Sequence, residues 1–204
     1  IKEKSLLKSL VSQHAGTLLA DAGQHQKARQ GFKTRRIIAF INLATSTNQI
    51  NAENFEDFST EMGRICRAVI DCGGDIDKII GGKMLVFFPV EQQDAIDGFL
   101  QMVEALQEIE KSFSTRIFVG AHAGEVIAGL LGVGDQCDFT MIGDSVNIAA
   151  RIQAVAEDIQ DDSALFSQSL FALMPARVNV KKVGSINLKG KKDAFDLFAF
   201  SKVM

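Results

Sequence analysis

The sequence predicts a β-sheet covered by helices, in an α/β or α+β arrangement. Strand-like apolar runs alternate with amphipathic segments of helical periodicity along most of the 204 residues. The pair Gly81-Gly82 separates two further strand-like segments and indicates a hairpin with a tight turn. Hydrophobic residues make up 47% of the chain and charged residues 23%, which suits one well-filled globular core. Helices at this spacing between strands favour a layered fold of sheet and helices.

The first half of the chain gives the clearest periodicity. Residues 5–20 carry apolar side chains at helical spacing, and the polar, basic segment after them is interpreted as a linker. Ile37–Ile41 is a continuous apolar run, typical of a buried strand. Residues 51–72 and 91–112 each place apolar side chains on one helical face, and residues 75–88 form the predicted hairpin between them.

The second half is richer in strands. Residues 115–124 and 125–132 are two strand-like segments, followed by a short strand over residues 138–142. A helix is predicted from there to about residue 157, with Asp144 as its N-cap. The tail contains a predicted short helix near residues 167–173 and three strand candidates, at 178–183, 185–188 and 194–199.

The composition excludes several classes of protein. A net charge of -3 with scattered Lys and Arg gives no reason to expect nucleic acid as a partner. The three cysteines, Cys66, Cys72 and Cys137, form no CxxC and are interpreted as reduced thiols that fill the core. No run of about 18 apolar residues is present, so none of these residues is expected to span a membrane. We expect a cytoplasmic domain, which a larger, membrane-anchored sensor protein could carry.

Five blocks of sequence occur in an order that is specific to one family. The most specific is Asp138–Arg151, which contains IGDSVNIAAR; the others are Arg36–Thr47, Gly73–Phe88, Arg116–Gly132 and Leu188–Lys192. Together they resemble the catalytic domain of class III adenylyl and guanylyl cyclases over roughly residues 35–200. The resemblance implies an α+β fold, an α/β sandwich whose core sheet has the ferredoxin-like order βαββαβ. It divides the chain into an N-terminal helix and linker that transmits signals (1–34) and a cyclase homology domain (35–204).

Members of this family close the 3′-hydroxyl of a nucleoside triphosphate onto its own α-phosphate and release pyrophosphate. The resemblance implies a head-to-tail dimer, either a homodimer or a heterodimer with another cyclase domain. One chain holds two Mg²⁺ or Mn²⁺ ions with two aspartates, while the other binds the base and stabilises the transition state.

The base-binding and transition-state residues of the family are present. Asn147 and Arg151 match the transition-state pair, and Arg suits the charge that develops on phosphate oxygens. Lys78 matches the lysine that recognises the base, and Thr140 matches its partner position. Because Lys with Thr suits adenine, whereas Glu with Cys would suggest guanine, the resemblance implies ATP rather than GTP. Lys189 matches a lysine that contacts the triphosphate.

The metal-binding residues of the family are missing. Its first aspartate position is occupied by Asn42 and its second by Gly82, with Lys83 next to it. An amide oxygen is a poorer ligand than a carboxylate for a hard cation, and glycine offers no side chain. We therefore expect that a homodimer of this chain is inactive. Asp75 and Asp77 are nearby in sequence, but strand alternation predicts that both point to the face opposite Lys78, so we do not expect them to replace the lost ligands.

Three functions are compatible with this pattern. The first is a cyclase half that complements a partner bearing the aspartates. The second is a non-catalytic domain that senses nucleotide or dimerises within a larger signalling protein. The third is an active enzyme with unorthodox metal ligands, which an assay with excess Mn²⁺ would reveal.

Each of these residues also has a simpler interpretation. Asn42 could be a turn residue, Lys78 and Arg151 solvated charges, and Thr140 an ordinary strand residue. His122 is interpreted as a core or surface histidine rather than a ligand. The glycines of Arg116–Gly132 lack the GxGxxG order of a dinucleotide-binding motif.

Overall fold

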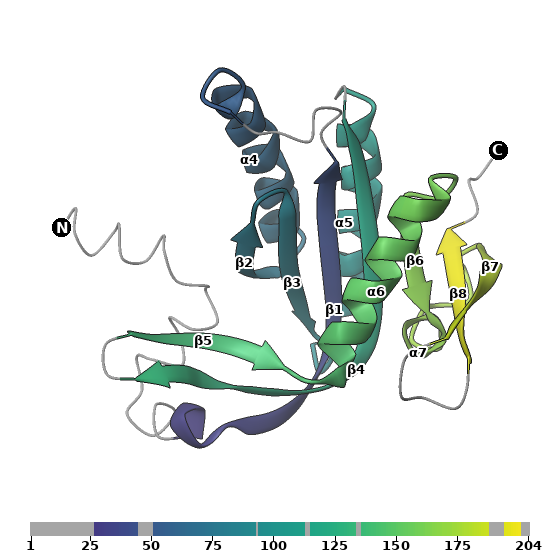
Figure 1. The fold of residues 1–204 in the computed structure, drawn as a ribbon. Helices are drawn as coiled ribbons and strands as arrows, with labels where there is room; N and C mark the ends of the chain where they lie inside the picture. The colour runs from purple at the N-terminus through teal and green to yellow at the C-terminus, as the bar shows by residue number, and fades with distance from the viewer. Residues whose placement is uncertain are drawn as a thin grey trace.

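The strand predicted over Ile37–Ile41 is an inner strand of the sheet (Figure 1). It belongs to β1 (Phe32–Ala44), which pairs antiparallel with β3 (Lys83–Pro89) on one side and with β4 (Arg116–Val133) on the other. The computed structural model describes residues 27–44, 51–92, 94–112, 115–133, 136–187 and 194–200.

The remaining helices and strands follow the predicted order. They are α4 (Phe55–Asp71), β2 (Asp75–Ile80), α5 (Ala95–Glu110), β5 (Gln136–Ile142), α6 (Asp144–Ile159), β6 (Ala164–Ser167), α7 (Gln168–Phe171), β7 (Val180–Asn187) and β8 (Ala194–Phe200).

The sheet has the order β2-β3-β1-β4-β6-β8-β7, with β5 paired to β4. Its first four strands, joined through α4 and α5, form the βαββαβ unit with the ferredoxin-like strand order. The predicted α+β fold with a ferredoxin-like core is therefore confirmed.

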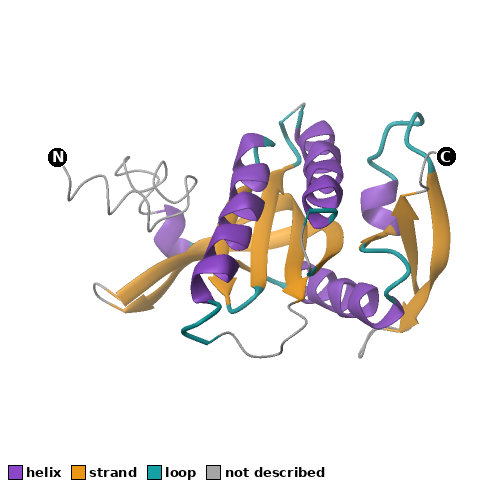
Figure 2. Cartoon of the chain, turned by 90° about the horizontal axis from the view of Figure 1, so that it is seen from above, coloured by secondary structure: helices purple, strands orange, loops and turns teal. Residues whose placement is uncertain are grey.

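Helices cover both faces of the sheet (Figure 2). On one face, α4 and α5 bury Ile65 and Phe99 against alternate β1 residues such as Ile37 and Ile41. On the other face, α6 contributes Ala149 to a cluster with Ile38, and its later turns pack on strands further along the sheet. Burial on both faces explains why β1 is apolar at successive positions.

The segments expected at 115–124 and 125–132 are one continuous strand, β4, of 18 residues. Its second half leaves the body of the sheet and pairs with β5 on one side and with the start of β1 on the other, so that these strands form an arm (Figures 1 and 2). Gly124 does not end the strand. It instead allows the start of α6 to pack closely, because a Cβ there would collide with Ser145 Oγ.

The linker was predicted too long at its C-terminal end. β1 begins at Phe32, and residues 32–36 pair with β4. Lys33 and Arg35 are exposed on this strand and alternate with more buried residues. A strand with one solvent-exposed face contains many polar residues, so its composition is similar to that of a linker.

The C-terminal part differs from the prediction in two ways. β6, a strand of four residues, was not predicted, and it pairs with β4 and β8. The candidates at 178–183 and 185–188 are one strand, β7, with a register irregularity between Lys182 and Gly184.

The predicted capping of α6 was wrong by one residue. Asp144 is the first helical residue, and the N-cap is Gly143, which has φ 147° and no side chain to accept a hydrogen bond. A carboxylate in the first turn still interacts favourably with the positive end of the helix dipole.

Two predictions lie outside the described residues: the helix over residues 5–20 and the position of Lys189. Within the ranges described above, no helix is long and apolar enough to cross a membrane.

Candidate functional site

Lys78 and Thr140, far apart in sequence, meet through Asp77. Thr140, on β5, donates from its Oγ1 to Asp77 Oδ2 at 3.2 Å. Lys78 Nζ lies 3.3 Å from the same carboxylate and 3.4 Å from Asp138 Oδ2. The two residues matched to base recognition therefore belong to one hydrogen-bonded group, which we call the base cluster: Asp77, Lys78, Asp138 and Thr140.

A β-bulge on β2 creates this arrangement. Ile76 pairs with Val86 and Lys78 with Leu85, so Asp77 is an extra residue without a partner on β3. Strict alternation would have placed Asp77 on the face opposite Lys78, and that expectation was wrong. A bulge re-aims side chains locally, and here it brings the carboxylate to the ammonium.

Burial and charge act in opposite directions within the base cluster. The side chain of Asp77 is 4% exposed, and this burial raises the pKa of Asp77 although Lys78 and Thr140 oppose the rise. Burial also disfavours the charged form of Lys78, but attraction to Asp77 and Asp138 outweighs it and raises the pKa of Lys78. The ammonium therefore stays charged, at 33% side-chain exposure.

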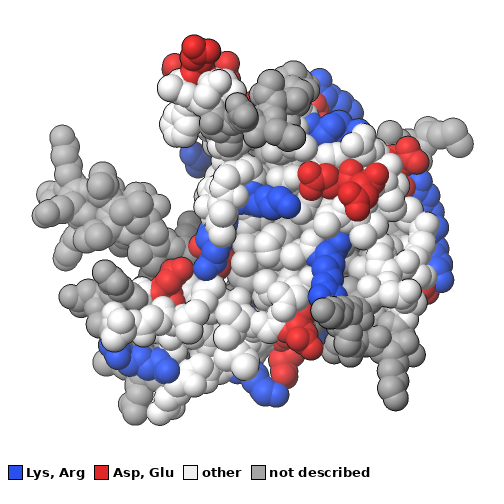
Figure 3. Space-filling view, viewed as in Figure 1, with Lys and Arg blue, Asp and Glu red and all other residues white. Residues whose placement is uncertain are grey.

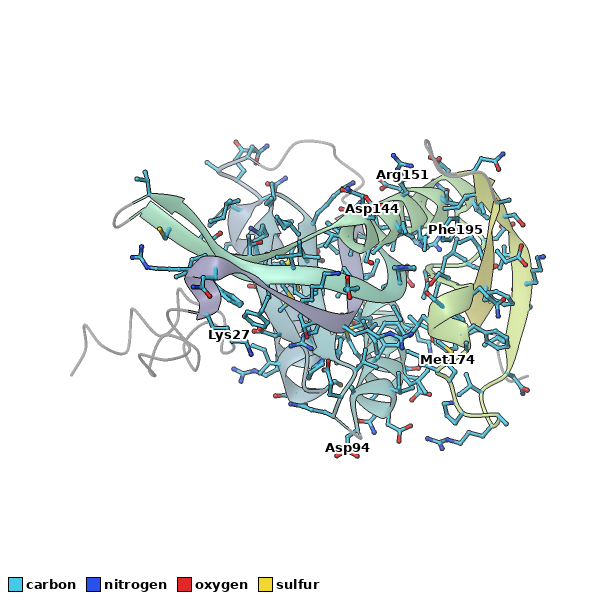
Figure 4. The ribbon with its side chains drawn as sticks, turned by 90° about the horizontal axis from the view of Figure 1, so that it is seen from below. Lys27, Asp94, Asp144, Arg151, Met174 and Phe195 are labelled. Atoms are coloured by element: carbon cyan, nitrogen blue, oxygen red, sulfur yellow. The ribbon has the colours of Figure 1, made fainter. Side chains whose placement is uncertain are left out.

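Asn147 and Arg151 lie on the exposed side of α6, one turn apart. Figure 4 shows Arg151 at the outer edge of the molecule, on the same helix as Asp144. Within the described part of the chain, neither side chain has a hydrogen bond or an ion pair. Both are thus available to a group approaching from outside.

The glycines of β4 fix the position of α6. A Cβ at Gly120 would collide with the backbone nitrogen of Gln153, so only glycine allows the helix to lie this close. Ser145 Oγ donates to the carbonyl oxygen of Glu125 at 2.8 Å and ties the start of the helix to the same strand. Gly120 and Gly124, from the glycine series that lacked a nucleotide-binding pattern, therefore pack against a helix that carries candidate site residues.

Asn42 and Gly82 are neighbours in space. Leu43 N donates to Gly82 O at 2.9 Å, and a Cβ added to Gly82 would lie 3.6 Å from Asn42 Oδ1. The two positions at which the resemblance expects metal-binding aspartates are therefore side by side, on β1 and at the β2–β3 turn.

A polar network occupies the surroundings of Asn42. Asn42 Nδ2 donates to Glu157 Oε2 at 3.1 Å, and Gln153 Nε2 donates to the same oxygen at 3.0 Å. Lys83 Nζ donates to Gln153 Oε1 at 3.2 Å and lies 4.0 Å from Glu157 Oε2. We call these four residues, Asn42, Lys83, Gln153 and Glu157, the closed network, because its one carboxylate and one ammonium are paired within it.

The closed network does not fit a pair of divalent cations. Each Mg²⁺ in such sites is held through one or two carboxylates together with phosphate oxygens, so a pair of ions would need more than the one Glu and two neutral amides present here. The Lys83 ammonium adds a charge of the wrong sign within 4.0 Å of that Glu. Nor do the described ranges contain any group of three or more His, Cys, Asp or Glu side chains able to hold a metal ion.

Asp75 and Asp77 lie away from the Asn42 position. Asp77 belongs to the base cluster, and Asp75 pairs with Phe87, at the end of the hairpin opposite Gly82. Neither carboxylate therefore lies at the positions where the resemblance expects metal-binding aspartates.

His122 is a core residue, as interpreted from the sequence. It is 6% exposed, and its Nδ1 lies 2.9 Å from Ser167 Oγ. Burial, with a smaller effect of Arg35, lowers the pKa of His122 to about 4. Cys66 and Cys72 pack at the edge of the core, where burial raises the pKa of each thiol.

Sequence reasoning missed Asp77, Gln153 and Glu157. Gln153 and Glu157 are four residues apart on α6, a spacing that places them on one helical face, but their contact with β1 is tertiary. The role of Asp77 depends on a bulge, for which the alternating pattern of β2 gives no signal.

Comparison with known proteins assigns the chain to a family. Residues 78–201 match the family model described as the adenylate and guanylate cyclase catalytic domain. The chain is 27% identical over 184 residues to the adenylate cyclase of Anabaena cylindrica, covering 81% of this chain and 36% of that protein. It is 24% identical over 170 residues to the terminal-differentiation specific adenylate cyclase of Dictyostelium discoideum, covering 77% of this chain and 8% of that one.

The fold agrees with that assignment. A bacterial light-regulated adenylyl cyclase has a similar structure, with a TM-score of 0.80 and 19% sequence identity, covering 98% of this chain and 61% of that chain. The two curated relatives are much longer than the part that this chain matches. With more than half of its residues matched by the family model, the chain belongs to the adenylate and guanylate cyclase catalytic domain family.

Proposed function

We propose that this domain is one half of an adenylyl cyclase site, which contributes the base-binding and transition-state groups to a partner chain that brings the metal-binding aspartates. The observation that carries this proposal is the contrast between the two sets of residues. Lys78, Asn147 and Arg151 keep donors that can face a ligand. The residues around Asn42 are hydrogen-bonded to one another instead.

The proposed reaction converts ATP to cyclic AMP and pyrophosphate. A bond forms between the 3′-oxygen and the α-phosphorus, the bond from that phosphorus to the bridging oxygen breaks, and the hydroxyl proton is released. Arg151 would stabilise charge on the phosphoryl oxygens, and Asn147 would orient the same group. Lys78 with Thr140 would hold the base, and Lys189 would contact the triphosphate. The divalent ions would be held by the partner's carboxylates.

The face that carries α6 also bears on how a partner would dock. Acidic and basic side chains form separate small patches there (Figure 3). A partner surface that carries charges of both signs would therefore fit better than one that is negatively charged throughout. We propose a heterodimer with an aspartate-bearing cyclase domain as the active form.

A second function is favoured by the closed network. If no partner supplies aspartates, a pocket that binds a nucleotide without metal would serve as a sensing or dimerisation module of a larger signalling protein. In that case ATP would bind equally well with and without Mg²⁺, and no cyclic nucleotide would form.

A pair of assays separates these functions. The purified chain alone, given ATP or GTP with excess Mn²⁺, should show no turnover, and turnover above the blank would contradict the proposal. Co-expressed with aspartate-bearing cyclase domains of the same genome, it should yield cyclic AMP. If no combination yields product while calorimetry detects ATP binding, the domain is a sensing module.

A further inference from the structure

The proposed function gives no role to Asp77 or Asp138 of the base cluster, and of these two Asp77 is the one that contacts both Lys78 and Thr140. Its side chain is almost fully buried, at 4% exposure, and its carboxylate contacts both residues that are matched to base recognition. A buried carboxylate is costly unless its hydrogen bonds are satisfied. Here the partners are Thr140 Oγ1, at 3.2 Å, and Lys78 Nζ, at 3.3 Å.

The hydrogen bond from Thr140 determines what its hydroxyl can offer a ligand. A hydroxyl has one proton to donate and lone pairs with which to accept. An ionised carboxylate only accepts, so the proton of Thr140 must point to Asp77. Towards a ligand, Thr140 is then an acceptor only.

Lys78 is constrained in the opposite sense. Its ammonium has three protons and no lone pair. Two protons are directed to Asp77 and Asp138, at 3.3 and 3.4 Å, which leaves one for a ligand. The base cluster therefore presents one fixed donor beside one fixed acceptor.

We propose that Asp77 is a positioning residue for base selectivity, which makes the base cluster complementary to an amino group next to an unprotonated ring nitrogen. This inference rests on the proposed binding of a nucleoside triphosphate. Adenine has this edge, with N1 as acceptor and the 6-amino group as donor. Hypoxanthine and guanine have a protonated N1 and a 6-oxo group. In the same orientation, the N1 proton would face the ammonium of Lys78, and the 6-oxygen would face the hydroxyl oxygen of Thr140.

The pair ATP and ITP isolates this effect, because their purines differ only at positions 1 and 6. The wild-type chain should bind ATP at least about tenfold more tightly than ITP, since mismatched polar groups lose hydrogen bonds on both sides. In Asp77→Asn the side-chain amide can donate to Thr140, whose proton is then free to turn outward. The ratio of the two dissociation constants should fall towards one.

Three further variants distinguish a change in base selectivity from a general loss of folding or charge. Asp75→Asn removes the same charge two residues away on β2 and should keep the wild-type ratio. Thr140→Val should lose the preference for ATP, and Thr140→Ser, which keeps the hydroxyl, should retain it. Thermal unfolding of each variant checks that it is folded, and the ratio is measured by calorimetry in EDTA.

The outcomes separate the two proposals. If the wild-type chain binds ATP and ITP equally, or if Asp77→Asn keeps a wild-type ratio, the role of Asp77 is overturned and the proposed function stands. If the wild-type chain binds no nucleoside triphosphate, even with a partner domain, the proposed function falls and the role of Asp77 with it.

Discussion

The base cluster and the closed network are both small polar groups at the sheet, but they differ in what they leave unpaired. In the base cluster, Lys78 has two acidic neighbours and is one-third exposed, so that its ammonium can still reach a ligand. In the closed network, the carboxylate of Glu157 is shared among Asn42, Gln153 and Lys83. The two groups therefore differ in bonding rather than in exposure, because the Glu157 carboxylate, although 39% exposed, is bonded to neighbouring side chains of the same network.

The residues at positions 42 and 82 also affect the stability of the fold. Two carboxylates brought together without a cation would repel each other and lower the stability. Asn42 and Gly82 avoid that repulsion, and Asn42 instead bonds to α6 through Glu157. Variants of both polar groups and of α6 test this contrast.

The largest effect is expected at Arg151. In the co-expressed pair, Arg151→Ala should lower kcat by about 10²–10³, the usual cost of removing a preorganised donor to a developing charge. The matched control is Arg67→Ala, another exposed arginine, which lies on α4. Equal rates for the two variants would mean that Arg151 is a solvated surface charge.

Restoring the aspartates tests whether the network is closed to metal. We expect Asn42→Asp with Gly82→Asp to bind Mn²⁺ poorly, because Lys83 stays close to the site and a Cβ at residue 82 would lie 2.7 Å from Leu43 O. Adding Lys83→Ala should tighten Mn²⁺ binding by about tenfold, since it removes one like charge.

The control for this triple variant carries Lys111→Ala in place of Lys83→Ala, because Lys111 is an exposed lysine after α5. Calorimetric titration with Mn²⁺ gives the affinities. Tight binding by the double variant would show that Lys83 does not exclude the ion.

The closed network should contribute measurably to stability. Glu157→Gln keeps the shape of the side chain but removes the charge that accepts from Asn42 and Gln153, so we expect a loss of about 1–2 kcal/mol. Asp158→Asn, an exposed neighbour, should change the free energy of unfolding by less than about 0.5 kcal/mol. Urea unfolding measures both, and equal values would contradict a stabilising network.

The smallest effect concerns pH. Burial raises the pKa of Asp77, so it protonates at a higher pH than an ordinary aspartate; the titratable groups that face it are Lys78 beside it and Asp138 on β5. A protonated Asp77 can donate to Thr140, so the preference for ATP over ITP should weaken as the pH falls through that pKa. Ratios measured by calorimetry between neutral and mildly acidic pH check this, and a ratio that rises on acidification would contradict it.

The same shift has a defined sign for stability. Because the folded state favours the protonated form, Asp77 contributes stability at low pH that is lost as the pH rises through its folded pKa. The wild type should therefore lose stability relative to Asp77→Asn as the pH rises through the folded-state pKa of Asp77.

Local patterns in the sequence were sufficient for most of the fold. Residues close together in sequence are enough to recognise the apolar run Ile37–Ile41, the Gly81-Gly82 turn and the periodicity of α4, α5 and α6. Of the glycine pair, Gly81 takes the positive φ of 59°. β6 escaped prediction because four residues carry too little pattern, and its pairing with β4 and β8 is determined by distant parts of the chain.

In the candidate site, too, some residues could be predicted from the sequence, while others depend on contacts between distant elements. Family resemblance placed Lys78, Thr140, Asn147 and Arg151 at positions where the structure leaves them near one another or exposed. It did not reveal Asp77, whose position depends on an unpaired residue in β2, nor the contact of Glu157 with Asn42. Both are contacts between elements distant in sequence, where no local rule applies.

We propose that this chain supplies only the base-binding and transition-state half of a composite site. Its most direct test pairs the chain with an aspartate-bearing cyclase domain whose own base-binding lysine and transition-state arginine have been removed, so that the composite site alone can work. We expect cyclic AMP from the mixture and none from either chain alone, even with Mn²⁺. Product from the isolated chain, or from the mixture with Arg151→Ala at an undiminished rate, would contradict it.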